Sequence, residues 1–284
     1  MKVSLFVYGT LRHGESNFTY MKEASCKAEQ ARTSGKLYDT GEGYPAMTAE
    51  SGAVYGELYV LDKENLERIH ELEGYFAENH QNNLFDLKEV TVMTDTGEFH
   101  ALTYVMNESR TNGMKQIESG DWKEYLFASE LPEETLYFAY GSCMDTERFK
   151  LAGVDHHFSE VIGAGKTERY SVKFTISVND GGRADLVEEH GGAEGILYRV
   201  SKEAVEYLYV REGVGTGMYR PAFIGVKVNG REYKQCLTFT VIDKKEEFRP
   251  PGHYSSEILK GAEGRLSPEY VKQIKRYMDE LPEM

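Results

Sequence analysis

Cysteine is scarce in this sequence of 284 residues, which contains only Cys26, Cys143 and Cys236. The three form no Cys-x-x-Cys pair and no cysteine–histidine spacing that is typical of a zinc site. The sequence therefore predicts neither a disulfide framework nor a metal centre. We expect a protein of a reducing compartment, the cytoplasm.

Positively charged residues are also fewer than negatively charged ones. Lysine and arginine total 33 against 47 aspartates and glutamates, which gives a formal net charge of −14. Such a surface repels phosphate backbones and anionic lipid headgroups. The apolar run near the N-terminus, Val3 to Val7, is too short for a signal peptide or a membrane span. We therefore expect neither nucleic acid nor a membrane as a partner.

The chain contains an internal duplication. Leu5 to Thr10 and Tyr137 to Ser142 are both short apolar runs. Each ends in tyrosine, glycine and a residue with a hydroxyl side chain, threonine or serine. Gly56 to Gly74 matches Gly195 to Gly213 at a constant offset of 139 residues, without a gap. A repeat this regular predicts two related domains.

The predicted boundary is the charged, proline-containing stretch 130–134, which divides the chain into domains 1–132 and 133–284. In each copy, runs of β-branched and aromatic residues predict strands. Between two of these strands, a helix runs from an N-cap at Asp62 or Ser201 to a glycine. This pattern predicts an α+β fold in which a curved mixed sheet or barrel is flanked by helices.

Two short segments, Tyr8-Gly9-Thr10-Leu11 and Tyr140-Gly141-Ser142-Cys143, are candidate ligand-binding turns. A strand that ends in Tyr-Gly-Thr or Tyr-Gly-Ser presents backbone N–H groups at the edge of the sheet, where glycine allows a ligand to approach closely. An isolated motif of this kind usually only shapes a turn. Its recurrence at equivalent places favours a role in binding a carboxylate or an oxyanion.

The second candidate motif is a glutamate directly before the glycine that ends a helix, Glu73-Gly74 and Glu212-Gly213. The negative end of the helix dipole disfavours a carboxylate and raises its pKa. Most such glutamates are surface residues. A glutamate with a raised pKa is nevertheless suited to act as a general base.

These motifs carry a resemblance to the gamma-glutamylcyclotransferase-like superfamily. The first half resembles its gamma-glutamylamine cyclotransferase branch through Tyr8-Gly9-Thr10-Leu11-Arg12, Gly43-Tyr44-Pro45-Ala46, Gly56-Glu57-Leu58-Tyr59, Glu73-Gly74 and Gly120-Asp121-Trp122. The second half resembles the gamma-glutamylcyclotransferase branch through Phe138-Ala139-Tyr140-Gly141-Ser142, Gly195-Ile196-Leu197-Tyr198, Glu212-Gly213-Val214, Gly217-Met218-Tyr219-Arg220 and Pro268-Glu269-Tyr270. The order and spacing of the motifs are more specific than any one of them.

The resemblance implies two tandem domains, each a small mixed β-barrel with flanking helices. It also implies that a gamma-glutamyl amide or amine is cyclised to 5-oxoproline, with release of the attached amine. Glu73 and Glu212 would transfer the proton. The implied substrate-binding residues are Tyr8, Gly9, Thr10, Leu11, Tyr140, Gly141, Ser142, Cys143 and Tyr219. Because ring closure is intramolecular, we expect no metal and no cofactor.

The two copies differ from the family pattern and from each other. Cys143 stands where the family usually has asparagine, which leaves open a thiol amidohydrolase that uses Cys143 with His156 or His157 as base. Phe85 in the first copy corresponds to Tyr219 in the second, so the two pockets differ in polar groups.

The alternative from another functional class is a binding protein that recognises gamma-glutamyl compounds without turning them over. The sequence leaves open which gamma-glutamyl compound is bound, whether both sites are active and what the oligomeric state is.

Overall fold

A computed structural model describes residues 2–189 and 191–284. The chain divides into two compact units, Met1–Glu130 and Leu131–Met284, and each is described by itself. Among the described residues, no helix has the length and apolar character needed to span a membrane.

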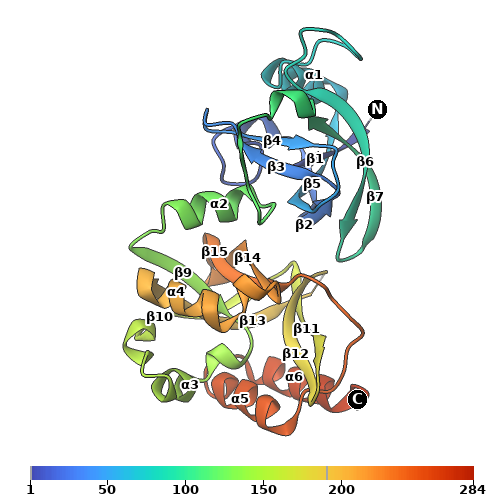
Figure 1. The fold of residues 1–284 in the computed structure, drawn as a ribbon. Helices are drawn as coiled ribbons and strands as arrows, with labels where there is room; N and C mark the ends of the chain where they lie inside the picture. The colour runs from blue at the N-terminus through green and yellow to red at the C-terminus, as the bar shows by residue number, and fades with distance from the viewer. Residues whose placement is uncertain (1, 190) are drawn as a thin grey trace. The chain divides into compact units, whose positions relative to one another are not determined.

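The first unit is built on a closed barrel of five strands (Figure 1). Around the barrel these are β1 (Lys2–Val7), β5 (Val54–Asp62), β2 (Ser25–Thr33), β6 (Asp86–Thr94) and β7 (Gly97–Val105). Neighbouring strands are antiparallel except at the closure, where β7 lies parallel to β1. Figure 1 shows β6 and β7 as a long curved hairpin on one side.

Shorter elements complete this unit. A three-stranded sheet contains β3 (Lys36–Asp39), β4 (Pro45–Thr48) and β8 (Lys115–Gln116). The helices are α1 (Lys63–Leu72) and α2 (Trp122–Ser129), with 3-10 turns η1 (Phe18–Met21) and η2 (Glu108–Arg110).

The second unit repeats this barrel. Its strands, in the same circular order as their counterparts, are β9 (Glu134–Ala139), β13 (Ala193–Ser201), β10 (Glu160–Thr167), β14 (Tyr219–Val228) and β15 (Arg231–Val241). Closure again joins a parallel pair, β15 and β9. The predicted fold class, two small mixed barrels with helices, is therefore confirmed.

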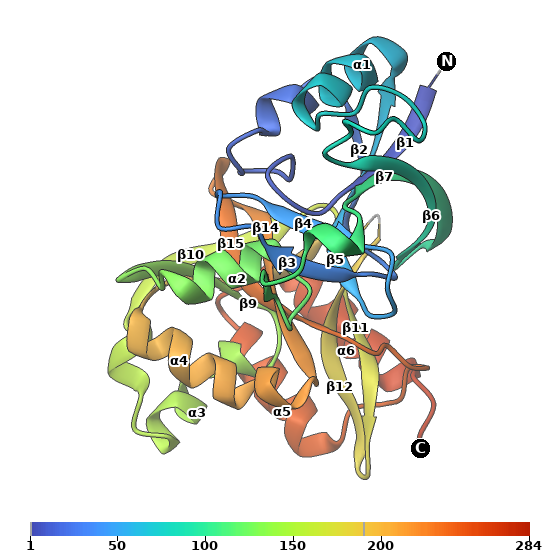
Figure 2. The same cartoon turned by 45° about the horizontal axis from the view of Figure 1, so that its top comes forward.

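Additional elements enlarge the second unit. Figure 2 shows a long hairpin of β11 (Tyr170–Val178) and β12 (Gly181–Glu188). The helices are α3 (Thr146–Leu151), α4 (Lys202–Arg211), α5 (Gly252–Ala262) and α6 (Pro268–Glu280), with 3-10 turns η3 (Ser142–Met144), η4 (Asp155–Phe158) and η5 (Val214–Thr216).

Equivalent threonine side chains form a hydrogen bond across the parallel strand pair that closes each barrel. The Thr103 hydroxyl donates to the Phe6 carbonyl at 3.0 Å, and the Thr238 hydroxyl donates to the Phe138 carbonyl at the same distance. A Cβ atom on Gly56 would lie 2.3 Å from the Val7 carbonyl oxygen, which is closer than real contacts allow. Glycine is therefore required where β5 crosses β1.

The helix that carries each candidate glutamate is also delimited in the same way. Asp62 caps α1 by accepting from the Asn65 N–H, and Ser201 caps α4 by accepting from the Ala204 N–H. Each helix is followed by a glycine with positive φ, +62° at Gly74 and +64° at Gly213. These left-handed glycines end the helices and fix the preceding glutamates at the C-terminal end.

Candidate active sites

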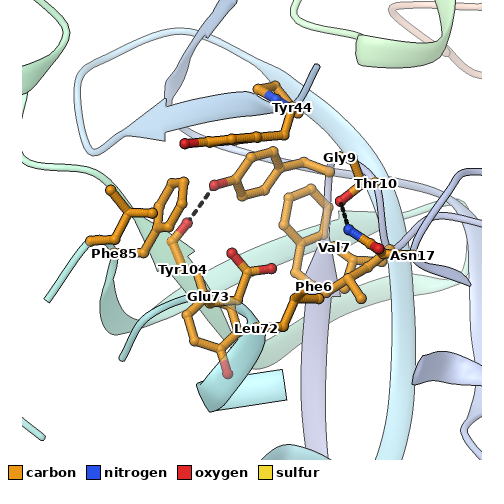
Figure 3. Close-up of a pocket in the computed structure, with 14 residues that line it drawn as sticks. Phe6, Val7, Gly9, Thr10, Asn17, Tyr44, Leu72, Glu73, Phe85 and Tyr104 are labelled. Atoms are coloured by element: carbon orange, nitrogen blue, oxygen red, sulfur yellow. Dashed lines mark hydrogen bonds between the residues drawn. The ribbon is translucent and has the colours of Figure 1, made fainter. Parts of the chain in front are cut away.

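The first unit contains a pocket of about 220 Å³ (Figure 3). It lies among the turn after β1, the end of α1, the segments that lead into β4 and β6, and β7. The lining residues are Phe6, Val7, Tyr8, Gly9, Thr10, Leu11, Asn17, Tyr44, Pro45, Leu72, Glu73, Leu84, Phe85 and Tyr104. The pocket thus brings together the predicted turn, Tyr8 to Leu11, and Glu73, which lie far apart in the sequence.

Glu73 is the one acidic residue among the described residues that line this pocket. It occupies the C-cap of α1, and Figure 3 shows its carboxylate in the middle of the lining side chains. Within residues 2–189 and 191–284, no side chain or backbone N–H donates a hydrogen bond to this carboxylate. Burial raises the pKa of Glu73 to about 7, because the apolar surroundings disfavour the charged form. A carboxyl group with such a pKa can both accept and return a proton near neutral pH.

The turn opposite Glu73 is held in a fixed conformation. The Arg12 N–H donates to the Gly9 carbonyl at 3.0 Å, and the Asn17 N–H donates to the Thr10 carbonyl at 3.0 Å. The Asn17 side-chain amide also donates to the Thr10 hydroxyl at 3.1 Å. A Cβ atom on Gly9 would lie 2.7 Å from the Pro45 ring, so glycine is required for this packing.

Two aromatic residues complete the walls of the first pocket. Tyr104 comes from β7, and its carbonyl accepts a hydrogen bond from the Tyr8 hydroxyl at 2.8 Å. Tyr44 directly precedes β4. Neither is among the site residues predicted from the sequence. For Tyr104 a signal existed, because Leu102-Thr103-Tyr104 repeats as Leu237-Thr238-Phe239.

The corresponding pocket of the second unit is much smaller, about 30 Å³. Its lining residues are Tyr137, Tyr140, Gly141, Ser142, Cys143, Ala184, Glu212, Tyr219, Phe239 and Tyr254. The predicted turn, Glu212 and Tyr219 are therefore brought together here as well. Tyr254, contributed by α5, was not predicted, and no repeated motif marks it.

Glu212 differs from Glu73 because its carboxylate already has partners. The Cys143 thiol donates to Glu212 Oε1 at 3.3 Å, and Arg211 Nε lies 3.8 Å from the same oxygen. Burial raises the pKa of Glu212, while the adjacent guanidinium opposes that rise. In the first copy, the positions of Arg211 and Cys143 are occupied by the apolar residues Leu72 and Leu11.

The tyrosine hydroxyls of the second pocket also bind protein groups. The Tyr219 hydroxyl donates to the Ala184 carbonyl at 2.6 Å, and the Tyr254 hydroxyl accepts from the Ala184 N–H at 3.2 Å. The Tyr140 hydroxyl donates to the Phe239 carbonyl at 2.7 Å. In this conformation the second pocket is small, and its tyrosine hydroxyls are hydrogen-bonded to protein groups.

The structure does not support a thiol nucleophile at Cys143. Burial raises the pKa of this thiol to about 11, so it stays protonated near neutral pH. The thiol forms hydrogen bonds with Glu212 and Arg211 among others. Nδ1 of His157 instead lies 3.1 Å from the Ser201 hydroxyl, and the His156 ring lies tilted against the His157 ring with their centroids 3.9 Å apart.

Candidate metal ligands are not grouped at either pocket. Among the described residues, no three His, Cys, Asp or Glu side chains are placed to hold a metal ion.

Comparison with known proteins identifies the family. Residues 5–124 match the profile "Gamma-glutamyl cyclotransferase, AIG2-like", and residues 193–274 match "AIG2-like family". The chain is 45% identical over 284 residues to YkqA of Bacillus subtilis (strain 168), with 99% of each chain covered. The crystal structure of YkqA matches with a TM-score of 0.90 and 42% identity, covering 100% of both chains.

A further relative matches a shorter part of the chain. A protein of Niallia circulans, named gamma-L-glutamyl-butirosin B gamma-glutamyl cyclotransferase, is 44% identical over 122 residues, which cover 43% of this chain and 76% of that protein.

The fold and the matches define a class: a tandem of two AIG2-like, gamma-glutamylcyclotransferase-type domains. The chain belongs to the gamma-glutamylcyclotransferase family.

Proposed function

We propose that the first unit cyclises gamma-glutamyl amides to 5-oxoproline and releases the attached amine, with Glu73 as the proton-transferring residue. The observation that carries this proposal is the half-buried Glu73 carboxylate in the pocket opposite the Tyr8 to Leu11 turn. Its pKa of about 7 suits a group that acts as base and then as acid.

In the proposed reaction, the α-ammonium of the glutamyl group gives one proton to Glu73. The resulting amine attacks the γ-carbonyl carbon, and the bond from that carbon to the leaving nitrogen breaks. The proton held by Glu73 and the second proton from the attacking nitrogen pass to the leaving nitrogen, which departs as an ammonium. Backbone N–H groups of the turn, Tyr8 to Leu11, would hold the α-carboxylate. The pocket chiefly has to fold the substrate so that its two ends meet.

The proposed substrates are gamma-glutamyl amides of amines rather than of amino acids. No lysine or arginine is among the described residues that line the first pocket. A leaving group with a carboxylate would therefore lack a counter-charge and would be repelled by the Glu73 carboxylate. The name of the Niallia circulans relative, gamma-L-glutamyl-butirosin B gamma-glutamyl cyclotransferase, supports a gamma-glutamyl compound as the substrate.

We assign the turnover to the first unit alone. In the second unit the Glu212 carboxylate accepts from the Cys143 thiol, and the pocket has about 30 Å³ against about 220 Å³ in the first. A glutamyl group would have to displace these internal contacts before it could reach Glu212.

The test compares two substrates that differ by one group, gamma-glutamyl ethylamide and gamma-glutamylglycine. We expect 5-oxoproline and ethylamine in equal amounts, with kcat/KM for the ethylamide at least about tenfold higher, a difference of about 1.4 kcal/mol. A preference for gamma-glutamylglycine would refute the proposed substrate class. Binding of both compounds without any 5-oxoproline would instead favour the binding protein.

A further inference from the structure

A cluster of four buried charged side chains lies outside the first pocket. Arg12 Nη1 lies 2.6 Å from Asp121 Oδ1, and Lys123 Nζ lies 2.8 Å from Glu57 Oε1. Arg12 Nε completes the cluster at 3.4 Å from the same Glu57 oxygen. All four side chains are at most 5% exposed, and together they carry no net charge.

The cluster is joined directly to the proposed binding turn. Arg12 follows Leu11, the last pocket-lining residue of that turn. Beyond it, the His13 N–H donates to the second Glu57 oxygen at 2.8 Å. Glu57 belongs to β5, and Lys123 lies in the first turn of α2. The two residues that follow the turn, Arg12 and His13, are therefore bound to the barrel, and Arg12 is also bound to the N-terminus of α2.

Glu57 stays ionised over the whole physiological pH range. Burial raises the pKa of Glu57, but the Lys123 ammonium and the Arg12 guanidinium outweigh this and hold it at about 2. Buried ion pairs of this kind contribute little net stability, because desolvation offsets most of their attraction. Their hydrogen bonds do restrict the positions of the charged groups, since each group satisfies its partners in one geometry.

The second unit holds the corresponding residues by a different route. Met144 corresponds to Arg12 and Tyr198 to Tyr59. The Arg265 guanidinium donates to the Met144 carbonyl at 2.6 Å and to the Tyr198 hydroxyl at 3.0 Å. In the first unit the Tyr59 hydroxyl donates to Glu57 at 2.8 Å. A guanidinium from a remote segment of the chain thus contacts the residue after the turn, where Met144 occupies the position that corresponds to Arg12.

We propose that Arg12, Glu57, Lys123 and Asp121 are positioning residues, which hold the Tyr8 to Leu11 turn in the conformation that binds the glutamyl group. This inference rests on the proposed function of the first unit. It predicts that a disturbed cluster weakens substrate binding while leaving proton transfer by Glu73 nearly intact.

The test uses a double variant, Glu57→Gln with Lys123→Met, because Arg12→Met alone would leave two buried carboxylates with Lys123 as the one remaining cation of the cluster. The double variant removes one charge of each sign, and the amide oxygen introduced by Glu57→Gln can still accept from the His13 N–H. We expect KM for gamma-glutamyl ethylamide to rise about tenfold or more and kcat to stay within about threefold. Lys123→Arg keeps the cation and should retain a KM close to that of the unmodified protein.

Val92→Ala is the matched control for stability. Val92 is fully buried in β6, lines neither the pocket nor the cluster, and leaves a cavity when truncated. Loss of folded protein lowers the apparent kcat without moving KM, so this control should keep its KM. Hydrogen exchange of the amides of residues 9–13 gives a second readout, which should accelerate in the double variant and not in Val92→Ala.

An unchanged KM and unchanged exchange in a folded double variant would overturn the positioning role while leaving the proposed function in place. A lack of 5-oxoproline from the unmodified protein would overturn both.

Discussion

Replacing Glu73 by glutamine should stabilise the first unit at alkaline pH. Burial raises the pKa of Glu73 from 4.5 to about 7. The native state therefore keeps this proton to a higher pH than the unfolded state, and its stability falls as the pH rises from about 4.5 to about 7. The difference amounts to about 3 kcal/mol at about pH 8 and to less than about 1 kcal/mol at about pH 5. Glutamine has a similar shape and avoids this penalty.

Trp122 makes the effect measurable. It is the single tryptophan of the chain, lies in the first unit and is 2% exposed, so its fluorescence reports on unfolding of that unit. Urea unfolding of Glu73→Gln should give a free energy of unfolding up to about 3 kcal/mol higher at about pH 8, with little gain at about pH 5.

The control is Glu71→Gln, two residues earlier on the exposed face of α1. Its effect should be small and equal at the two pH values. A Glu73→Gln variant with no gain at about pH 8 would refute the argument that the pocket desolvates this carboxylate.

Three further predictions concern activity and packing. As the pH increases, kcat/KM should rise with an apparent pKa near 7, because Glu73 can accept a proton only in its ionised form. A profile that is flat between about pH 6 and about pH 8 would contradict this. Cys143→Ala should form 5-oxoproline at a rate within about twofold of the unmodified protein. Loss of 5-oxoproline formation in this variant would instead favour the thiol mechanism. Gly56→Ala should lower the free energy of unfolding by more than about 2 kcal/mol in the Trp122 transition, because its Cβ would lie 2.3 Å from the Val7 carbonyl oxygen. Wild-type stability in that variant would contradict the close strand crossing.

The internal repeat made the fold predictable. A matching strand, a capped helix and a glycine stop occur at a constant offset, and further strands match in the same order, so one set of local signals could be checked against the other. The left-handed Gly74 and Gly213 and the paired Thr103 and Thr238 hydroxyls are the structural counterparts of that repetition. The meeting of Glu73 with the Tyr8 to Leu11 turn also followed from the order of these elements.

The small volume and internal hydrogen bonds of the second pocket could not be predicted from the sequence. They depend on the directions in which the Cys143 and Arg211 side chains point, and on Tyr254, which α5 brings in from a distant part of the chain. The charge cluster was equally hidden. Arginine and lysine are usually surface residues, and only the folded chain places Arg12 and Lys123 beside Glu57.

The most direct test of the proposed active site is the rate of 5-oxoproline release from gamma-glutamyl ethylamide by the unmodified protein, Glu73→Gln and Glu212→Gln. The two variants make the same chemical change at equivalent positions of the two units, so each serves as the control for the other. We predict that Glu73→Gln lowers kcat by about two to four orders of magnitude with little change in KM. Glu212→Gln should stay within about twofold of the unmodified protein. A Glu73→Gln variant that turns over at the unmodified rate, or a loss of activity confined to Glu212→Gln, would contradict the assignment of the active site to the first unit.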